Sequence, residues 1–360
     1  KVIVGVIDTG IDINHSDLQG KIWTNTGEIA DNGIDDDSNG YIDDVNGWNF
    51  YDKNNQVHDE NAGLEESHGT HIAGIIAGLS DADPDLEANQ NNVEIMPLKV
   101  FSNGTAYTSD IIAAIDYAES MGVKIINCSW GCGSDNTALE EAMADSDILF
   151  VVAAGNSRLD LAETPVYPAV YNLDNQITVT SVNQDGGLSY FSDYSEDIVD
   201  IAALGRDIQS TLPNNQYGLL TGTSMSTAVV TAGAAAVLDN DNSLDTSEIK
   251  DRLLQGADKI SPLSGYVRDA ARLNVEEAIS GNNQTEIQEL DYEEDFDIKG
   301  FASLDEALQL FNSSPTVQVA AGYGQTLVLK QDGTVWAWGA NNYGQCGIGI
   351  ATYSNTLTQV

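Results

Sequence analysis

The chain has 360 residues, of which 42% are hydrophobic and 33 are glycine, so it is long enough for one large domain with a buried core and additional pieces. Its 14 lysines and arginines stand against 56 aspartates and glutamates, a formal net charge of -42 at pH 7. Such a charge repels nucleic acids and anionic membranes and attracts divalent cations, so we expect no nucleic-acid partner. No apolar run approaches the roughly 18 residues that a membrane-spanning helix needs, so no such segment is expected.

The first 280 residues alternate short β-branched runs with longer stretches of helical period. Buried strands are expected at residues 1–8, 94–101, 123–130, 148–155 and 176–182. Helices are expected at residues 68–79, 108–122, 135–146, 228–238, 243–257 and 268–280. This alternation predicts an α/β domain over residues 1–280, with a mostly parallel sheet and helices on both faces.

The composition changes twice after residue 280. Residues 281–315 are acidic and poor in periodic apolar positions, which predicts a linker. One short helix is expected within this linker, in "SLDEALQLF", where Ser303 and Glu306 can form a capping box. From residue 316 onward glycine, tryptophan and β-strand residues predominate, so residues 316–360 are expected to form a separate all-β module.

Three cysteines, Cys128, Cys132 and Cys346, cannot make a disulfide framework. Cys128 and Cys132 lie close together on a stretch expected to be extended, where their Cα atoms would be farther apart than a disulfide allows. The thiols therefore say little about the compartment. The chain opens directly with a strand, so we expect any signal segment or pro-segment to lie outside it.

Four polar residues stand at the expected ends of strands or starts of helices, and each has an ordinary structural interpretation. Asp8 in "VIDTGID" and Asn156 in "VVAAGN" each follow a strand and can be turn residues. His68 in "SHGTHIAG" can be a hydrogen-bonded structural histidine, and Ser224 in "TGTSMSTAVV" can be a helix cap. The same positions also allow the side chains to converge at the carboxyl edge of a parallel sheet, with the Ser224 backbone N–H free to bind an oxyanion.

His68 and His71 share one face of the expected helix, which raises the question of a zinc site. The zinc-peptidase pattern requires histidines at i and i+4 with a glutamate between them. Here the spacing is i and i+3, and Gly69 and Thr70 offer no base. The pattern therefore disfavours zinc.

Five motifs, "IDTGID", "HGTHIAG", "INCSWG", "AAGN" and "GTSM", occur together in this order. Their order and rough spacing are those of the subtilisin-like serine peptidases, and residues 1–280 resemble that family. The resemblance implies that Ser224 is the nucleophile, His68 the general base and then the general acid, and Asp8 the carboxylate that orients the imidazole. It further implies a serine endopeptidase that cleaves peptide bonds through an acyl-enzyme and needs no cofactor for the chemistry.

The same resemblance implies roles for further residues. Asn156 is implied as the side-chain donor to the oxyanion, beside the Ser224 backbone N–H and with Thr223 in support. Two backbone edges are implied to pair with an extended peptide substrate. The residues of these edges are Gly104 on one side and Ser129, Trp130 and Gly131 on the other.

Three positions depart from the family pattern. The family motif continues from the serine to a proline and often a histidine, where this chain has Ala228 and Val229, and Leu204 replaces a common proline. None of the three is a catalytic group. The departures therefore bear on rate and specificity rather than on the class of reaction.

The acidic stretch "DDDSNGYIDD" has the alternating oxygen ligands of a calcium loop, with Gly40 at a position that permits a sharp turn. The twelfth position is Asn46 rather than a bidentate glutamate, so the affinity is expected to be weaker than in a complete EF-hand. A solvated acidic insertion is the alternative interpretation. The expected ligands of a structural Ca²⁺ are Asp35, Asp37, Asn39 and Asp43.

The last stretch, "VQVAAGYGQTLVLKQDGTVWAWGANNYGQCG", resembles one repeat of the regulator of chromosome condensation family, a β-propeller of about seven such units. Asp332 and Gly333 are expected to form a tight hairpin turn, and Trp336 and Trp338 to share one face of a strand. A lone blade cannot bury its faces, so we expect an incomplete repeat in a chain that continues past residue 360. A small glycine-rich hairpin appended to the enzyme is the alternative.

These observations together predict a secreted or cell-surface serine endopeptidase whose partners are polypeptide substrates. Two alternatives stay open. The peptidase domain could be a non-catalytic scaffold of a binding or adhesion protein, although the intact set of Asp8, His68, Asn156 and Ser224 argues against this. An esterase could use the same triad, and the "SWG" edge favours peptides without excluding esters.

Overall fold

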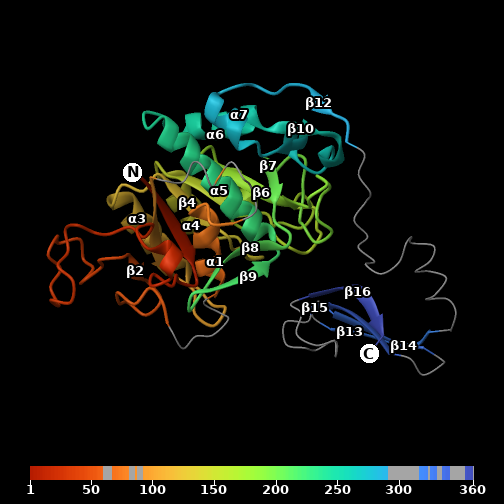
Figure 1. Ribbon diagram of the computed structural model, residues 1–360, viewed down its shortest axis with the longest axis horizontal. Coiled ribbons are helices and arrows are strands. Elements are labelled where there is room, and N and C mark those ends of the chain that lie inside the picture. The colour runs from red at the N-terminus through yellow and green to blue at the C-terminus, as the bar shows by residue number, and fades with distance from the viewer. Residues whose placement is uncertain are drawn as a thin grey trace. The chain divides into compact units, whose positions relative to one another are not determined.

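The computed structural model describes residues 1–59, 67–80, 86 and 92–290, together with the backbone of four strands between residues 316 and 359. Contacts divide the chain into two units, Lys1–Glu293 and Glu294–Val360 (Figure 1). The expected short helix with Ser303 and Glu306 and the expected turn at Asp332 and Gly333 lie outside the described residues.

The first unit is built on one ten-stranded sheet. Among its described strand pairs only β10–β11 is antiparallel, and the strand order is β12-β10-β11-β7-β6-β5-β4-β1-β3-β2. The strands are β1 (Val2–Asp8), β2 (Trp48–Asn49), β3 (Val93–Lys99), β4 (Ile125–Cys128), β5 (Leu149–Ala153), β6 (Gln176–Val182), β7 (Ile201–Leu204), β10 (Asp258–Ile260), β11 (Ala271–Arg272) and β12 (Ile287–Gln288). A separate hairpin pairs β8 (Ile208–Leu212) with β9 (Gln216–Leu220).

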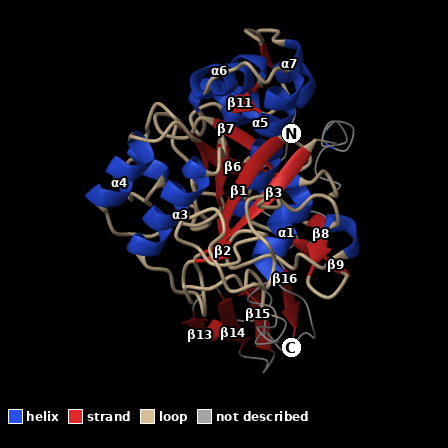
Figure 2. Cartoon of the chain, turned by 90° about the vertical axis from the view of Figure 1, so that its left-hand side faces the viewer, coloured by secondary structure: helices blue, strands red, loops and turns tan. Residues whose placement is uncertain are grey.

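Helices cover both faces of this sheet. The helices are α1 (Ser67–Ile76), α3 (Thr108–Ser120), α4 (Thr137–Ala144), α5 (Thr223–Asn240), α6 (Thr246–Gly256) and α7 (Val275–Ser280), with 3₁₀ turns at Ser16–Leu18, Ala169–Tyr171, Ser261–Leu263 and Arg268–Ala270. Figure 2 shows α3 and α4 on one side of the central strands and α1 on the other, and α5 packs against α1. The predicted α/β architecture with a mostly parallel sheet is confirmed.

The central strands and α5 are buried because their sequences carry almost no polar face. Every residue of β5 and β6 is buried, as a strand covered on both faces requires. Helix α5 consists mainly of alanine, valine, threonine and glycine, and most of its residues are buried, so it lies close against β4, β5, β6 and β7. This packing fixes where α5 begins relative to the carboxyl ends of the strands.

One expected helix is shorter than its sequence pattern predicts. Residues 268–280 were expected to be helical throughout, but α7 begins only at Val275, after the 3₁₀ turn and β11. Asp269 and Ala270 have φ angles of 54° and 52°, in the left-handed region, which a right-handed helix cannot include. The Asn274 side chain accepts a hydrogen bond from the Glu277 backbone N–H and so caps the helix at its later start.

The sheet of the first unit continues past residue 280, because β12 pairs with β10 through Lys259 and Ile287. The second unit contains a four-stranded antiparallel sheet in the order β13-β14-β15-β16. Its strands are β13 (Thr316–Gly322), β14 (Gln325–Lys330), β15 (Val335–Ala340) and β16 (Tyr353–Gln359). The division into residues 1–280, 281–315 and 316–360 stays a prediction.

The next two observations, on membrane-spanning helices and on the cysteines, hold for the described residues alone. Within them, no helix combines the length and the apolarity that crossing a bilayer demands. Cys128 and Cys132 are both free thiols, the first buried and the second exposed. Burial raises the pKa of the Cys128 thiol well above its usual value, with the nearby Asp8 carboxylate adding to the effect, so this thiol stays protonated.

Candidate active site

Asp8 and His68 meet where β1 ends and α1 begins. The His68 Nδ1 atom lies 2.8 Å from Asp8 Oδ1 and 2.9 Å from Oδ2. Asp8 is buried, and its Oδ1 also accepts hydrogen bonds from the Thr9 backbone N–H and hydroxyl. Because a carboxylate only accepts, Nδ1 of His68 carries the proton and Nε2 is left with a free lone pair.

The electrostatics of this pair favour a basic imidazole. Burial by itself lowers the pKa of His68, but the charge of the Asp8 carboxylate and its hydrogen bond outweigh that effect and raise the pKa above its usual value. The ring is partly buried, with 32% of the side chain exposed. His68 can therefore take up a proton at Nε2 while Asp8 stabilises the resulting cation.

A glycine permits the close approach of α1 to the end of β1. A Cβ atom at Gly69 would lie 2.2 Å from the Gly10 carbonyl oxygen and 3.2 Å from Asp8 Oδ1. The Gly69 backbone N–H donates to the Thr9 hydroxyl at 3.2 Å. The "HGTH" motif thus contains glycine because the first turn of α1 rests directly on the loop that carries Asp8.

His71 does not join His68 in a common site. It is fully buried, and its Nε2 lies 3.0 Å from the Ile208 carbonyl oxygen and 3.2 Å from that of Gly218. His71 therefore ties α1 to the β8–β9 hairpin, while His68 is bonded to Asp8. The two rings therefore have separate partners.

Ser224 is the second residue of α5, which follows Gly222. Helices α1 and α5 pack against each other, and each carries one expected catalytic side chain in its first turn. The Ser224 hydroxyl donates to the Ser129 carbonyl oxygen at 3.2 Å. Among the residues that the structure describes, it makes this hydrogen bond in place of one with His68; catalytic hydrogen bonds in free enzymes commonly tighten only when substrate binds.

A buried hydrogen-bond chain holds the first turn of α5 against β4, and sequence reasoning missed most of it. The Ser129 hydroxyl donates to the Ser224 carbonyl oxygen at 2.9 Å and accepts from Asn127 Nδ2 at 2.9 Å. Asn127 Oδ1 in turn accepts from the Thr231 hydroxyl at 3.0 Å. The signal was present in the sequence, because Asn127 is a polar residue inside an otherwise apolar strand.

Asn156 is oriented by Thr223. Its Oδ1 accepts from the Thr223 backbone N–H at 2.8 Å and from the Thr223 hydroxyl at 3.1 Å. The Gly155 backbone N–H donates to the same hydroxyl at 3.2 Å. With its oxygen committed to Thr223, the Asn156 amide presents Nδ2, a donor, beside the start of α5.

Lys99 is a further buried group near Asp8 that sequence reasoning did not single out. It ends β3, opposite Asp8 in the β1–β3 pairing, and is 3% exposed. Its ammonium donates to the carbonyl oxygens of Thr9 and Phe101, the latter at 2.9 Å. A buried cation thus holds the two loops that leave β1 and β3.

The residues of the two expected substrate edges follow β4 and β3 in the chain. Ser129 is buried and hydrogen-bonded to Ser224, and Trp130 packs against Phe101 with ring centroids 6.2 Å apart. A Cβ atom at Gly131 would lie 2.8 Å from a methyl group of Val166, so this edge is closely packed on one side.

Gly104 lies on the other expected edge, at the tip of an exposed turn. Its φ angle is 68° and that of Asn103 is 51°. Ser102 and Thr105 flank this turn and exchange two backbone hydrogen bonds of 3.0 Å.

The positions that depart from the family pattern lie in α5 and at the end of β7. Ala228 and Val229 are buried in α5, and Leu204 ends β7. Ala228 and Val229 belong to the core, and Leu204 packs against it.

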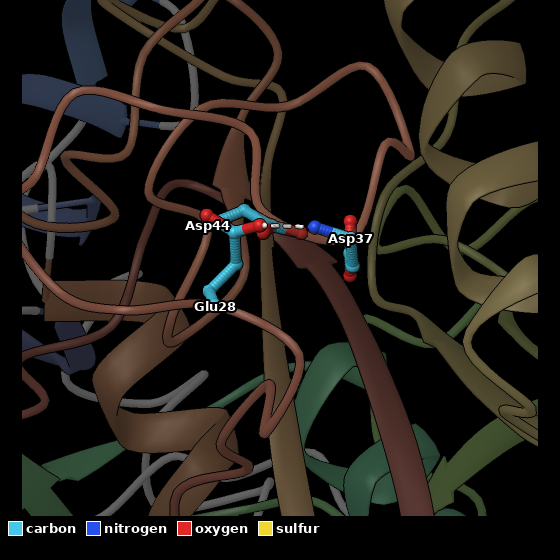
Figure 3. Close-up of side chains that lie close together, drawn as sticks. All are labelled: Glu28, Asp37 and Asp44. Atoms are coloured by element: carbon cyan, nitrogen blue, oxygen red, sulfur yellow. Dashed lines mark hydrogen bonds between the residues drawn. The ribbon is translucent and has the colours of Figure 1, made fainter.

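The acidic loop gathers carboxylates, although in a different combination from the expected one. Glu28, Asp37 and Asp44 each offer a carboxylate oxygen, and these oxygens lie within 4.8 Å of one another (Figure 3). Asp44 is fully buried; its carboxylate accepts from the Tyr117 hydroxyl at 2.5 Å and from Asn25 Nδ2 at 3.0 Å.

The other expected ligands have different contacts. Asp35 accepts from the backbone N–H groups of Asn39 and Gly40, at 3.0 and 2.8 Å. Asp43 accepts from the backbone N–H groups of Asn32 and Gly33, at 3.0 Å each. The Asn39 side chain donates its Nδ2 to Asp37 and Asp44. Of the four expected ligands, Asp37 alone belongs to the three-carboxylate group.

Comparison with known proteins places these residues in a family. The "Subtilase family" model matches residues 1–288, and the "Regulator of chromosome condensation (RCC1) repeat" model matches residues 316–345. The chain is 34% identical over 281 residues to "Thermophilic serine proteinase" of Bacillus sp. (strain AK1), covering 77% of this chain and 61% of that protein. It is 33% identical over 267 residues to "Thermitase" of Thermoactinomyces vulgaris, covering 73% of this chain and 83% of that protein.

A solved structure supports the same assignment. The crystal structure of a cold adapted subtilisin-like serine proteinase matches with a TM-score of 0.60 and 28% sequence identity, covering 76% of this chain and 88% of the other. The match to the family model spans the whole region that carries Asp8, His68, Asn156 and Ser224. The chain therefore belongs to the subtilase family.

Proposed function

We propose that this chain is a serine endopeptidase in which Asp8, His68 and Ser224 form the catalytic triad. The observation that carries the proposal is the 2.8 Å hydrogen bond between His68 Nδ1 and the buried Asp8 carboxylate, at the start of a helix that packs against the helix bearing Ser224. This arrangement leaves Nε2 of a basic imidazole available on a helix that packs against the helix of the serine hydroxyl.

The reaction follows from the chemistry of these three groups. Ser224 Oγ attacks the carbonyl carbon of the scissile peptide bond while His68 Nε2 takes the hydroxyl proton. When the tetrahedral intermediate collapses, the C–N bond breaks and His68 returns the proton to the leaving amine. Water then attacks the acyl-enzyme ester, His68 again accepts and returns a proton, and the product acid leaves with Ser224 restored. Asp8 stays ionised throughout and holds the imidazole in the reactive tautomer.

Two donors would stabilise the oxyanion in this scheme. One is the Ser224 backbone N–H, which lies in the first turn of α5 and has no partner within the helix. The other is Asn156 Nδ2, oriented through the bonds from Thr223 to Asn156 Oδ1. Loss of one such donor commonly lowers kcat by about 100- to 1,000-fold.

We propose polypeptides as the substrates, bound as an added extended strand. Ser129, Trp130 and Gly131 would form one edge and Gly104 the other, through their backbone groups. The support is the position of Ser129, whose carbonyl oxygen lies 3.2 Å from Ser224 Oγ. A peptide paired along this edge would pass directly over the nucleophile.

We propose that the acidic loop binds a structural Ca²⁺ through Glu28, Asp37 and Asp44. Carboxylate oxygens are the ligands that Ca²⁺ prefers, and Asp44 brings its charge into the protein interior, where like charges repel strongly without a cation. Burial and the Asp44 carboxylate raise the pKa of Tyr117 far above its usual value, so the Tyr117 hydroxyl remains a donor to Asp44. Asp35, Asn39 and Asp43 would shape the loop through the contacts described above.

We propose that the enzyme acts outside the cell or at its surface, and that residues 316–360 are one propeller-type repeat of a longer protein. The match to the repeat model and the four-stranded antiparallel sheet support the second part. Activity in the culture medium and in washed cells, compared with that in lysates, tests the location.

The triad is tested by Ser224→Ala, with Ser226→Ala as the matched control. Ser226 lies in the same helix, and its buried hydroxyl has no hydrogen-bond partner among the described residues. Hydrolysis of a peptide library should fall by several orders of magnitude in Ser224→Ala and remain near wild type in Ser226→Ala. A sulfonyl fluoride should label Ser224 only; peptide hydrolysis at the wild-type rate by Ser224→Ala would rule out the proposal.

A further inference from the structure

The loop that carries Asn156 is held by a carboxylate from a distant part of the chain. Asp193 Oδ1 accepts hydrogen bonds from the backbone N–H groups of Ser157 and Leu159, each at 2.8 Å. The Asp193 backbone N–H donates to the Gly155 carbonyl oxygen at 3.0 Å. Asp193 thus binds the loop on both sides of Asn156, although it makes no hydrogen bond with Asn156 itself in the described structure.

Asp193 is itself anchored to the sheet. Its carbonyl oxygen accepts from the Thr180 hydroxyl at 2.8 Å, and Thr180 lies in the fully buried strand β6. Asp193 is 1% exposed. Asp193 therefore fixes the loop at residues 155–159 relative to strand β6.

The contact with Gly155 is closely fitted. The φ angle of Gly155 is 122°, and a Cβ atom there would lie 2.1 Å from Asp193 Oδ2. The carboxylate occupies the space that a side chain at residue 155 would need. Glycine at this position allows both the backbone conformation and the approach of Asp193.

We propose that Asp193 is a positioning residue for the oxyanion donor, acting through the loop to hold Asn156 where its Nδ2 meets the developing charge. Three hydrogen bonds hold the chain on both sides of Asn156. The Asp193 carboxylate accepts two of them, and the Asp193 backbone N–H donates the third. Thr223 sets the rotation of the Asn156 amide, whereas Asp193 sets the position of its backbone. This inference rests on the proposed function, because it assigns Asn156 to the oxyanion.

Burying the Asp193 carboxylate is unfavourable by itself, which supports a specific role for this residue. Burial raises the pKa of Asp193, and the hydrogen bonds from Leu159 and Ser157 oppose that shift. A buried carboxylate is unfavourable unless its hydrogen bonds compensate. Here the compensating donors both belong to the Asn156 loop, so the same bonds that make the charge tolerable also fix the loop.

The test is a double-mutant cycle between Asp193 and Asn156, with kcat and KM measured on one peptide substrate. Asp193→Ala removes the acceptor and should lower kcat by about 10- to 100-fold with KM nearly unchanged, since misplacement by about 1 Å can cost that much. Asp193→Asn keeps one acceptor oxygen and should restore kcat to within a few-fold of wild type. In the Asn156→Ala background, Asp193→Ala should cause no further loss of kcat.

Asp200→Ala is the matched control. Asp200 is also a buried carboxylate, but it accepts from the Thr178 backbone N–H and pairs with Arg268, away from the Asn156 loop. It should lower thermal stability and leave the kcat of the folded enzyme nearly unchanged. Asp193→Ser, whose hydroxyl is too short to reach both N–H groups, carries the same cycle if Asp193→Ala does not fold.

The outcomes separate the two proposals. Unchanged kcat in Asp193→Ala, or losses that multiply in the double variant, would overturn the positioning role while leaving the triad intact. Unchanged kcat in Asn156→Ala would overturn both the assignment of Asn156 and the role of Asp193. Loss of kcat in Asp193→Ala that is rescued by asparagine and absent in the Asn156→Ala background supports the inference.

Discussion

Removing calcium is expected to destabilise the first unit of the chain (residues 1–293), the peptidase unit, because the carboxylates of Glu28, Asp37 and Asp44 then repel one another. Their oxygens lie within 4.8 Å of one another, and Asp44 is fully buried. Two unit charges about 5 Å apart repel by about 3 kcal/mol at an effective dielectric constant of about 20. Without a cation, the hydrogen bonds from Asn25, Asn39 and Tyr117 to Asp44 are left to oppose this repulsion.

The expected shift in melting temperature follows from mass action. A free Ca²⁺ concentration 100 times Kd stabilises the folded state by about 2.7 kcal/mol. For a unit of this size that corresponds to a rise in Tm of about 5 °C. Chelation with EDTA should lower Tm by that amount, and Tm should rise steadily with added Ca²⁺. Differential scanning calorimetry on the full chain measures both.

Two variants locate the ligands. Asp37→Ala should abolish most of the response to Ca²⁺ and EDTA, because Asp37 belongs to both the expected ligand set and the three-carboxylate group. Asp43→Asn should keep the response, since Asp43 lies outside that group and is bonded to backbone N–H groups. A Tm that is indifferent to EDTA and to added Ca²⁺ would refute the reasoning, and a loss of response in Asp43→Asn would favour the ligand set expected from the sequence.

Three further predictions concern the triad, the packing of α1 and the extent of the peptidase unit. Because neutral His68 is the base and its pKa is raised, kcat/KM should rise with pH through an apparent pKa above the usual value for histidine; Asp8→Asn should lower that pKa and reduce kcat by about 10,000-fold. Gly69→Ala should lower the free energy of unfolding by about 1 to 3 kcal/mol or more, because its Cβ would lie 2.2 Å from the Gly10 carbonyl oxygen. A chain ending at Glu293 should keep kcat/KM within a few-fold of the full chain, and a chain ending before residue 282 should have a lower Tm because it lacks β12.

Each of these has its own control. An unshifted pH profile in Asp8→Asn would show that another group sets the titration. Gly133→Ala adds a methyl group where no atom lies within 4 Å, so it should leave the urea midpoint nearly unchanged while Gly69→Ala lowers it. Loss of activity in the chain ending at Glu293 would show that residues after 293 are needed by the peptidase unit.

Much of the fold could be predicted from sequence because the central elements are locally distinct. The expected strand at residues 176–182 coincides with β6, and His68 lies in the first turn of a helix as expected. Helix α5 begins at Thr223 rather than at residue 228, so Ser224 lies inside its first turn instead of ahead of it. Runs of β-branched residues and helical stretches of small residues are typical of buried elements, so their burial can be predicted from composition. Boundaries failed where backbone geometry intervened, as at Asp269 and Ala270, whose positive φ angles delay the start of α7.

The candidate site, like the fold, could be predicted from the sequence only in part. The short motifs singled out Asp8, His68, Asn156 and Ser224 as candidates, because each has a glycine within two residues and stands at the end of a strand or the start of a helix. Lys99, with its bonds to the Thr9 and Phe101 carbonyl oxygens, had no comparable local signal.

What the sequence by itself determined is the set of elements and the polar residues at their ends; what only the tertiary structure decided is which distant side chains support them. Asp193 meets the Asn156 loop because β6 lies beside β5, and Asn127 meets Thr231 because α5 lies across β4. In the acidic loop, alternation of acids suggested one set of ligands, but the path of the backbone brings Glu28 and Asp44 to Asp37 instead. Local pattern specifies local conformation, whereas side chains far apart in sequence meet only through the packing of the whole chain.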